Sequence, residues 1–187
     1  MTGCLFALLA ALLAGFGARD QMLMAQLSAR SGPRPMLLIT GITTGALASG
    51  LAAWATQEVT VELSHAACLL VAAMALALAG VESLFVAPGK PAREPTNSLG
   101  AAAIVLFADQ ITDSARLLIL AIAMASEQPL AAGVGGAVGT GVALMLGANF
   151  AQGLLEAKSV LRMVRRVAGF VLLVAGGVLV ARLRTAL

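Results

Sequence analysis

A run of polar and charged residues interrupts an otherwise apolar stretch of the chain. The run reads Asp-Gln-Ile-Thr-Asp-Ser-Ala-Arg from Asp109 to Arg116, between the apolar segments AAAIVLFA and LLILAIAMA. If the stretch forms one continuous helix, Asp109, Thr112, Asp113 and Arg116 share one of its faces. Carboxylate and hydroxyl oxygens are the ligands that hard divalent cations prefer. The run therefore predicts a cation site whose carboxylates can exchange the cation for protons.

A second interruption lies in the first apolar stretch of the chain. Gly15 and Gly17 weaken a helix at this point, and Arg19, Asp20 and Gln21 follow them. A single charge at the centre of a bilayer costs at least about 2.5–3.5 kcal/mol even on the most lenient scale. The charged residues of both interruptions are therefore expected to face each other inside the protein rather than the lipid.

Two interpretations of these charges remain open. In the first, Asp20, Asp109 and Asp113 are the ligands of a transported Mn²⁺ or Ca²⁺ ion, and no resident cofactor is expected. In the second, the site is a structural clamp. Arg19 then pairs with Asp113. Arg116 then pairs with Asp109 or Asp20. Three aspartates against two arginines leave a formal charge of −1. Under the first interpretation, the ion-binding and proton-coupling residues are Asp20, Gln21, Asp109, Gln110, Thr112, Asp113 and Ser114, with Arg19 and Arg116 as charge partners.

The composition of the chain is that of a membrane protein. Of its 187 residues, 60% are hydrophobic and 11% are charged, and the mean hydropathy is +0.96. So few polar side chains cannot cover the surface of a water-soluble domain. Long Leu, Ala, Val and Gly runs with 4% aromatic residues favour spanning helices over a β-barrel. Since a span needs about 20 apolar residues, we predict an all-α membrane protein with six transmembrane helices, at 2–29 with a polar interruption, 35–54, 65–86, 101–125, 130–151 and 167–180.

The two halves of the chain resemble each other. Residues 87–98, which include three prolines, are predicted as a cytoplasmic linker between one three-helix repeat at 1–86 and another at 99–187. Because each half has an odd number of spans, the second half enters the membrane from the opposite side. Such inverted repeats are common in secondary transporters, which bind their substrate between the halves. A shift of 94 positions aligns Pro35 with Pro129, Gly41 with Gly135 and Gly45 with Gly139. The two Gly-x-x-x-Gly pairs are expected to let the second and fifth helices approach a neighbour closely.

Basic residues are unevenly distributed between the two sides of the membrane. Eight Lys and Arg residues lie on the side of the linker, and only Arg182 and Arg184 lie on the other side. Since positively charged loops face the cytoplasm, both termini are expected outside, in a bacterial inner membrane. The net charge of +3 then reports orientation rather than binding to nucleic acid. Glu82 is expected to reach the interface. Anionic lipid headgroups are expected to contact a basic run formed by Lys158, Arg162, Arg165 and Arg166.

The remaining reactive residues indicate no catalytic chemistry. Cys4 and Cys68 lie in apolar runs and are expected to pack as small residues. His65, near Glu58 and Glu62, is expected to be solvated. The sequence contains no Gly-x-Ser-x-Gly or His-Glu-x-x-His motif. An enzyme is therefore not expected.

The two interruptions follow a common pattern that is found in a known family. In the second half, Asp109 lies at the first acidic position of the pattern and Ser114 at its last. In the first half, Gly17, Arg19 and Gln21 match its glycine, its basic residue and a following glutamine. The chain thereby resembles the transmembrane-protein-165-like (Gdt-type) cation/proton exchangers of the LysE superfamily. Each antiparallel three-helix repeat of those proteins carries Glu-x-Gly-Asp-Lys/Arg-Ser/Thr in its first helix. The stretches 27–30 and 165–170 are also similar to the family's sequences.

This resemblance implies an exchanger of Mn²⁺ or Ca²⁺ for protons, but the chain departs from the motif. Asp113 replaces a basic residue, and Asp20 replaces Ser or Thr. Two acids have therefore changed place, which either relocates the ion site or identifies a member that has lost transport. Such a member would serve as a membrane scaffold or accessory protein. The family's other acidic positions are occupied by Gly15, Ala18 and Thr112.

Overall fold

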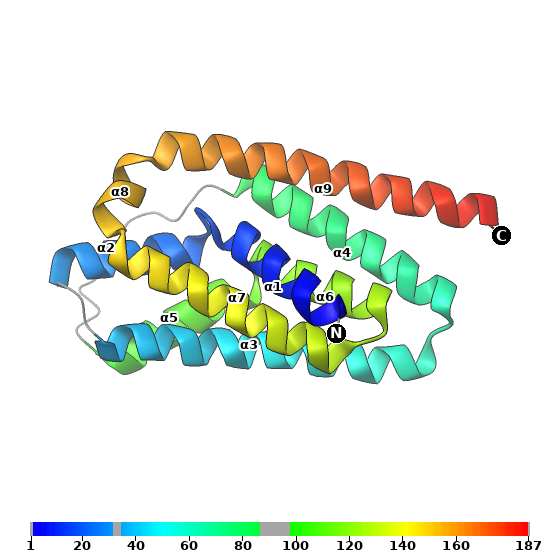
Figure 1. Ribbon diagram of the computed structural model, residues 1–187, viewed down its shortest axis with the longest axis horizontal. Helices are drawn as coiled ribbons and strands as arrows, with labels where there is room; N and C mark the ends of the chain where they lie inside the picture. Colours follow the sequence, from blue (N-terminus) through cyan, green and yellow to red (C-terminus); the bar gives the residue numbers. More distant parts are fainter. Residues whose placement is uncertain (1, 32–34, 87–97, 187) are drawn as a thin grey trace.

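The computed structural model describes residues 2–31, 35–86 and 98–186, and within these ranges the chain forms nine α-helices and no strand (Figure 1). The predicted all-α fold is thus confirmed. Ser98 caps α5, but the rest of the predicted linker 87–98 lies outside the described residues. The helices are α1 (Thr2–Gly15), α2 (Arg19–Ser31), α3 (Pro35–Glu62), α4 (His65–Phe85), α5 (Leu99–Ile111), α6 (Ser114–Ser126), α7 (Pro129–Asn149), α8 (Ala151–Glu156) and α9 (Lys158–Ala186).

Four of these helices, α3, α4, α7 and α9, are long and apolar enough to cross a membrane. The pair α1 and α2, bent by 57°, forms a fifth candidate span if it is counted as one. Helices α5 and α6 are apolar but have 13 residues each, fewer than the roughly 20 that a span needs. The chain is therefore a multi-pass membrane protein with four to five candidate spans, and these helices do not establish the sixth span that the sequence predicts.

The surface of the bundle supports this assignment. Large apolar side chains are exposed on the outer faces of several helices, among them Leu13, Val61, Phe85, Ile104 and Met163, each of which is at least 69% exposed. A soluble monomer rarely exposes apolar patches of more than a few hundred square ångströms. These faces are therefore suited to contact lipid.

The first helix of each half is broken. Residues 16–18 separate α1 from α2, and residues 112 and 113 separate α5 from α6. Gly17 has a φ of +70°, which glycine adopts without steric cost, and the predicted interruption of the first span is confirmed. The continuous helix predicted at 101–125 is wrong, because Asp113 is extended, with a φ of −82° and a ψ of 150°. Asp109 and Asp113 therefore do not share the face of one helix.

Glycines bring α4 and α9 into close contact. A Cβ atom built on Gly169 would lie 2.7 Å from the Gly80 carbonyl oxygen, and one built on Gly80 would lie 2.7 Å from the Gly169 carbonyl oxygen. Such contacts allow two backbones to approach closely, as small residues do in other membrane helix pairs. The crossing matters for the candidate site, because Glu82 and Arg165 lie within one turn of it on the two helices.

The glycine pair predicted to pack closely in the second half also does so. Cβ atoms on Gly135 and Gly139 would collide with the backbone carbonyl oxygens of Cys4 and Leu8 on α1. In the first half, Gly45 lies against Thr140 of α7, with 3.1 Å from its would-be Cβ to the Thr140 Cγ2 atom. Helices of one half therefore pack on helices of the other. Both cysteines are free, as expected for residues that serve in packing.

The last helix differs from the prediction at its start. The span predicted at 167–180 is part of α9, which begins nine residues earlier, at Lys158. Its first turns remain helical because Arg and Lys are good helix formers, and because Arg165 turns toward the protein interior. The short helix α8 was not predicted. Arg165 is consequently not a headgroup-facing residue of a loop, which corrects that expectation.

The contact between α4 and α9 can be tested with two glycine substitutions on α9, one at the contact and one away from it. Gly169→Ala should destabilise the protein by about 1–3 kcal/mol, because the added methyl group collides with the backbone of α4. Gly177→Ala, where no atom lies within 4 Å of the added Cβ atom, should leave stability unchanged or slightly raised. Thermal unfolding of the purified variants in one detergent would measure both. Equal unfolding temperatures would contradict the close crossing.

Candidate functional site

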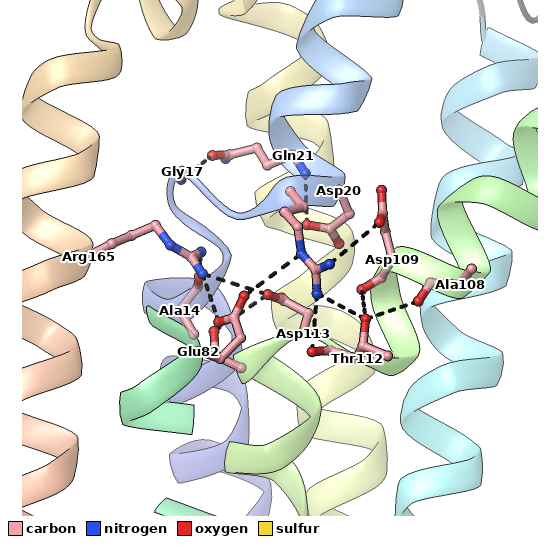
Figure 2. A network of polar contacts seen from close by, with 12 residues as sticks. Ala14, Gly17, Asp20, Gln21, Glu82, Ala108, Asp109, Thr112, Asp113 and Arg165 are labelled. Carbon is pink, nitrogen blue, oxygen red and sulfur yellow. Dashed lines mark hydrogen bonds and ion pairs between the residues drawn. The ribbon is translucent and has the colours of Figure 1, made fainter. Parts of the chain in front are cut away.

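Charged side chains from five helices meet beside the two helix breaks, and Figure 2 shows part of this group. Helices α4 and α9 contribute Glu82 and Arg165. Asp113 lies in the break before α6 and is 1% exposed. We call the group the ion network, and its members are Arg19, Asp20, Glu82, Asp109, Asp113, Arg116 and Arg165.

Arg165 joins α9 to both halves of the chain. Its Nη2 atom lies 2.9 Å from Glu82 Oε2 and 3.9 Å from Asp113 Oδ1. Its Nη1 atom donates a hydrogen bond of 3.3 Å to the carbonyl oxygen of Ala14, at the end of α1. The side chains of Arg165 and Glu82 are only 5% and 10% exposed. This pair is therefore the shortest ion pair of the network, and it is well enclosed.

Arg19 occupies the more open side of the network. Its contacts with Glu82 and with Asp109 are both 3.8 Å long. Its shortest contact is with Thr112, to which Nη2 donates hydrogen bonds of 2.9 Å at Oγ1 and 3.2 Å at the carbonyl oxygen. The side chains of Arg19 and Asp109 are 22% and 30% exposed. Arg19 is thus held less firmly than Arg165.

Asp20 and Arg116 form a second deeply buried part of the network. Both residues are 4% exposed, and they interact electrostatically with each other and with Asp113. Asp20 Oδ1 accepts a hydrogen bond of 2.7 Å from the Gln21 N–H. Arg116 Nη1 donates one of 2.9 Å to Thr140 Oγ1 of α7. Thr140 therefore anchors one nitrogen of Arg116 to α7.

Guanidinium groups lie at the carboxyl ends of both first half-helices. The Ala14 carbonyl at the end of α1 accepts from Arg165, and the Thr112 carbonyl at the end of α5 accepts from Arg19. The carboxyl end of a helix carries a partial negative charge, and in transporters with broken helices such ends coordinate the transported cation. In this chain two arginine side chains occupy the equivalent positions.

Two glutamines satisfy backbone groups near the breaks. Gln21 Oε1 accepts from the Gly17 N–H at 2.8 Å, and its Nε2 donates to the Ala143 carbonyl of α7 at 2.8 Å. Gln110 Nε2 donates to the Gly41 carbonyl of α3 at 3.1 Å. Each glutamine thus joins a broken helix of one half to a long helix of the other. Both residues were predicted as ion ligands, and the structure uses them as helix connectors.

The two hydroxyl groups predicted as ligands also lie in the network. Thr112 Oγ1 contacts the Ala108 carbonyl of α5 at 3.2 Å in addition to Arg19. Ser114 Oγ lies 3.5 Å from Asp113 Oδ1. The local sequence accounts for the break here, because Thr and Asp side chains compete with the helical backbone for hydrogen bonds.

Several buried atoms of the network have no hydrogen-bond partner among the described residues. They include Asp113 Oδ2, Glu82 Oε1 and two nitrogens of Arg116, Nε and Nη2. Buried polar groups are normally paired with protein or with ordered water. The network counts four carboxylates and three guanidinium groups, and its formal charge is −1. One added proton would bring this formal charge to zero.

A preformed metal site is not present in the described part of the chain, where no group of three or more His, Cys, Asp or Glu could hold a metal ion. Each predicted metal ligand has a guanidinium neighbour instead. Asp109 lies beside Arg19, Asp113 beside Arg165 and Asp20 beside Arg116. The predicted clamp pairing between Arg19 and Asp113 is replaced by these contacts.

Sequence reasoning missed two members of the network. Glu82 was expected to reach the interface and Arg165 to contact headgroups, but both are buried against each other. Glu82 is an acid within an apolar stretch, and this signal could have placed it inside. Arg165 gave no comparable signal, because nothing in the sequence distinguishes it from Arg162 and Arg166 in the same basic run, and both of those are exposed.

One further polar contact lies at the far end of the bundle. His65 Nδ1 lies 2.6 Å from Glu127 Oε1, and the side chains are 63% and 60% exposed. Glu127 ends α6 in the left-handed conformation, with a φ of 54°. His65 was expected to be solvated, and it is exposed as expected but has a carboxylate partner.

No protein-family model, curated protein or solved structure matches this chain. The resemblance to the Gdt-type exchangers therefore stays an inference from the motif residues. The site itself is defined by its geometry, which joins two broken helices through alternating opposite charges.

Adjacent arginines on α9 offer a test of the network. Arg165→Gln should lower stability by about 3–5 kcal/mol, because it leaves Glu82 and Asp113 without their nearest guanidinium. Arg166→Gln, at an exposed position, should change stability by less than about 0.5 kcal/mol. Thermal unfolding in detergent would compare the two variants.

The double variant Glu82→Gln/Arg165→Gln completes this test. It should be more stable than Arg165→Gln alone, since the unpaired carboxylate is removed together with its partner. The single variant Glu82→Gln is measured as well. If the double variant loses as much stability as Glu82→Gln and Arg165→Gln lose together, the two side chains do not interact as described.

Proposed function

We propose that this chain is a proton-coupled secondary transporter that exchanges a divalent cation, Mn²⁺ or Ca²⁺, for protons at the ion network. The single observation that carries the proposal is the excess negative charge among four carboxylates and three guanidiniums inside a membrane protein. An uncompensated charge in such a place is costly. One proton neutralises it, so the protonated network is a suitable resting state.

Arg19 supplies a way for a divalent cation to bind without excess positive charge. If its side chain leaves the network, four carboxylates and two guanidiniums remain, with a formal charge of −2. A divalent cation neutralises this charge. Arg19 is the most exposed of the three arginines and its two ion contacts are 3.8 Å long. We infer that Arg19 acts as a tethered cation that alternates with the transported one, and that Asp109 receives the ion first.

The proposal includes the six-span inverted repeat, with α5 and α6 acting together as one broken span. Three features support it: both first helices are broken, glutamines connect the halves reciprocally, and small residues mediate the contacts between them. In Figure 1, α1 begins and α9 ends in the right half of the view, whereas α8 lies at its left. With the basic start of α9 in the cytoplasm, both termini lie outside a bacterial inner membrane.

A structural clamp is the second candidate function. It is favoured by the guanidinium groups that already occupy the carboxyl ends of α1 and α5. In that case the network joins the two halves, and the protein serves as a scaffold or accessory subunit without transport. The two candidates differ in whether Asp109, which is 30% exposed at its side chain, is needed for flux or only for structure.

Proteoliposomes separate these candidates. Vesicles with an acidic lumen should take up Mn²⁺ or Ca²⁺ from outside as protons leave, while Mg²⁺ and amino acids serve as comparison solutes. Asp109→Asn and Asp113→Asn should reduce uptake to the level of protein-free vesicles, because the coupling carboxylate is lost. Glu58→Gln on α3, an exposed acid outside the network, should transport like the original protein.

Thermal unfolding of the same variants makes the result decisive. If the protein is a transporter, Asp109→Asn should keep the unfolding temperature of the original protein and lose cation uptake. The clamp predicts no cation movement driven by the pH gradient in any folded variant, together with a lower unfolding temperature for Asp113→Asn. The second outcome would contradict exchange and support the scaffold.

A further inference from the structure

Two adjoining cavities lie along α9, one beside the end of α4 and the other beside α1. One has a volume of about 210 Å³ and lies at the end of α4, between residues 83–86 and three arginines of α9. The other has a volume of about 270 Å³ and is lined by both α1 and α9. Ser83 and Arg165 line both cavities. The two cavities therefore adjoin at these two residues, and we call them together the groove.

The end of the groove beside α4 is strongly basic. Arg162, Arg165 and Arg166 line it, and Arg162 and Arg166 are exposed. Arg165 is 5% exposed, and its Nε atom lacks a hydrogen-bond partner among the described residues. None of the four Asp and Glu residues of the ion network lines this cavity. An anionic group that enters here meets the exposed guanidiniums of Arg162 and Arg166, while the guanidinium of Arg165 is paired with Glu82.

The rest of the groove is apolar. It is lined by Leu13 of α1, by Phe16 in the break after α1, and by Val164 and Val171 of α9. Leu118 of α6 also lines it. Leu13, Val164 and Val171 are each more than half exposed, so the groove opens to the surface that contacts lipid. Because α9 continues past the groove toward the other side of the bundle (Figure 1), an extended hydrocarbon chain can follow the helix.

We propose that this groove binds one anionic phospholipid, with its phosphate at Arg162 and Arg166 and one acyl chain between α1 and α9. A basic end joined to an apolar channel matches both parts of such a lipid, since basic pockets between membrane helices bind anionic headgroups. A second copy of this chain fits less well, because it would bring the same arginines into a positively charged interface. Lipid binding at the groove does not require transport by the ion network.

Native mass spectrometry with added lipid tests the site. The purified protein should retain one dioleoyl phosphatidylglycerol in preference to the zwitterionic dioleoyl phosphatidylethanolamine. Arg162→Gln/Arg166→Gln should weaken phosphatidylglycerol binding by about thirtyfold, as the loss of two arginine–headgroup attractions would give. The matched variant Arg182→Gln/Arg184→Gln, at the opposite end of the same helix, should bind like the original protein.

A second pair of variants tests the apolar part of the groove. Ala168→Trp places a large side chain in the groove and should abolish the preferential binding, whereas Ala175→Trp, exposed and outside it, should not. Equal retention of both lipids, an equal loss in the two arginine pairs, or full binding by Ala168→Trp would overturn the proposal. A lipid-free dimer that Arg162→Gln/Arg166→Gln dissociates would assign the groove to a second copy and would likewise overturn it.

Discussion

Charges buried in an apolar helix bundle must compensate one another, and this constraint organises the structure. Removing a single partner from a buried ion pair costs several kcal/mol, so Arg165, Glu82 and Asp113 hold α9, α4 and the start of α6 in fixed positions. The contacts run between the two halves of the chain as well as within them. The network therefore stabilises the association of the halves at the same place where we propose a site for ions.

Breaking two helices inside the bundle exposes backbone groups that need partners, and the same side chains provide them. Gln21 accepts from the Gly17 N–H, while Arg165 and Arg19 donate to the carbonyls at the ends of α1 and α5. The guanidinium groups consequently have two roles, since they balance carboxylates and they end helices. A cation that displaced one of them would have to replace both kinds of contact, and this requirement favours the loosely held Arg19 over Arg165.

The network is unevenly held, which is the feature that separates a carrier from a clamp. Arg165 and Glu82 approach to 2.9 Å in an enclosed environment, whereas Arg19 and Asp109 are 3.8 Å apart and partly exposed. If the network were only a structural clamp, short and enclosed ion pairs would be expected on both of its sides. The open side gives a proposed ion path its entry, and the enclosed side ties α9, which also forms one wall of the proposed lipid groove, to the same charges.

Much of this architecture follows from the sequence alone. Composition determined the all-helical membrane class, Gly15 and Gly17 indicated the first break, and the spacing of Gly135 and Gly139 indicated the close contact with a neighbouring helix. These features depend on local propensity and on the size of single residues, which can be read from the chain. The second break escaped prediction because Thr112 and Asp113 also fit one face of a regular helix.

The partners of each charge were decided only by the tertiary structure. Arg165 lies in a basic run with Arg162 and Arg166, yet of these three only Arg165 turns inward, because the glycine contact between Gly80 and Gly169 brings Glu82 opposite it. Attraction between charges acts over several ångströms and has no sequence period, so many pairings satisfy the same composition. The crossing of the helices selects one of them.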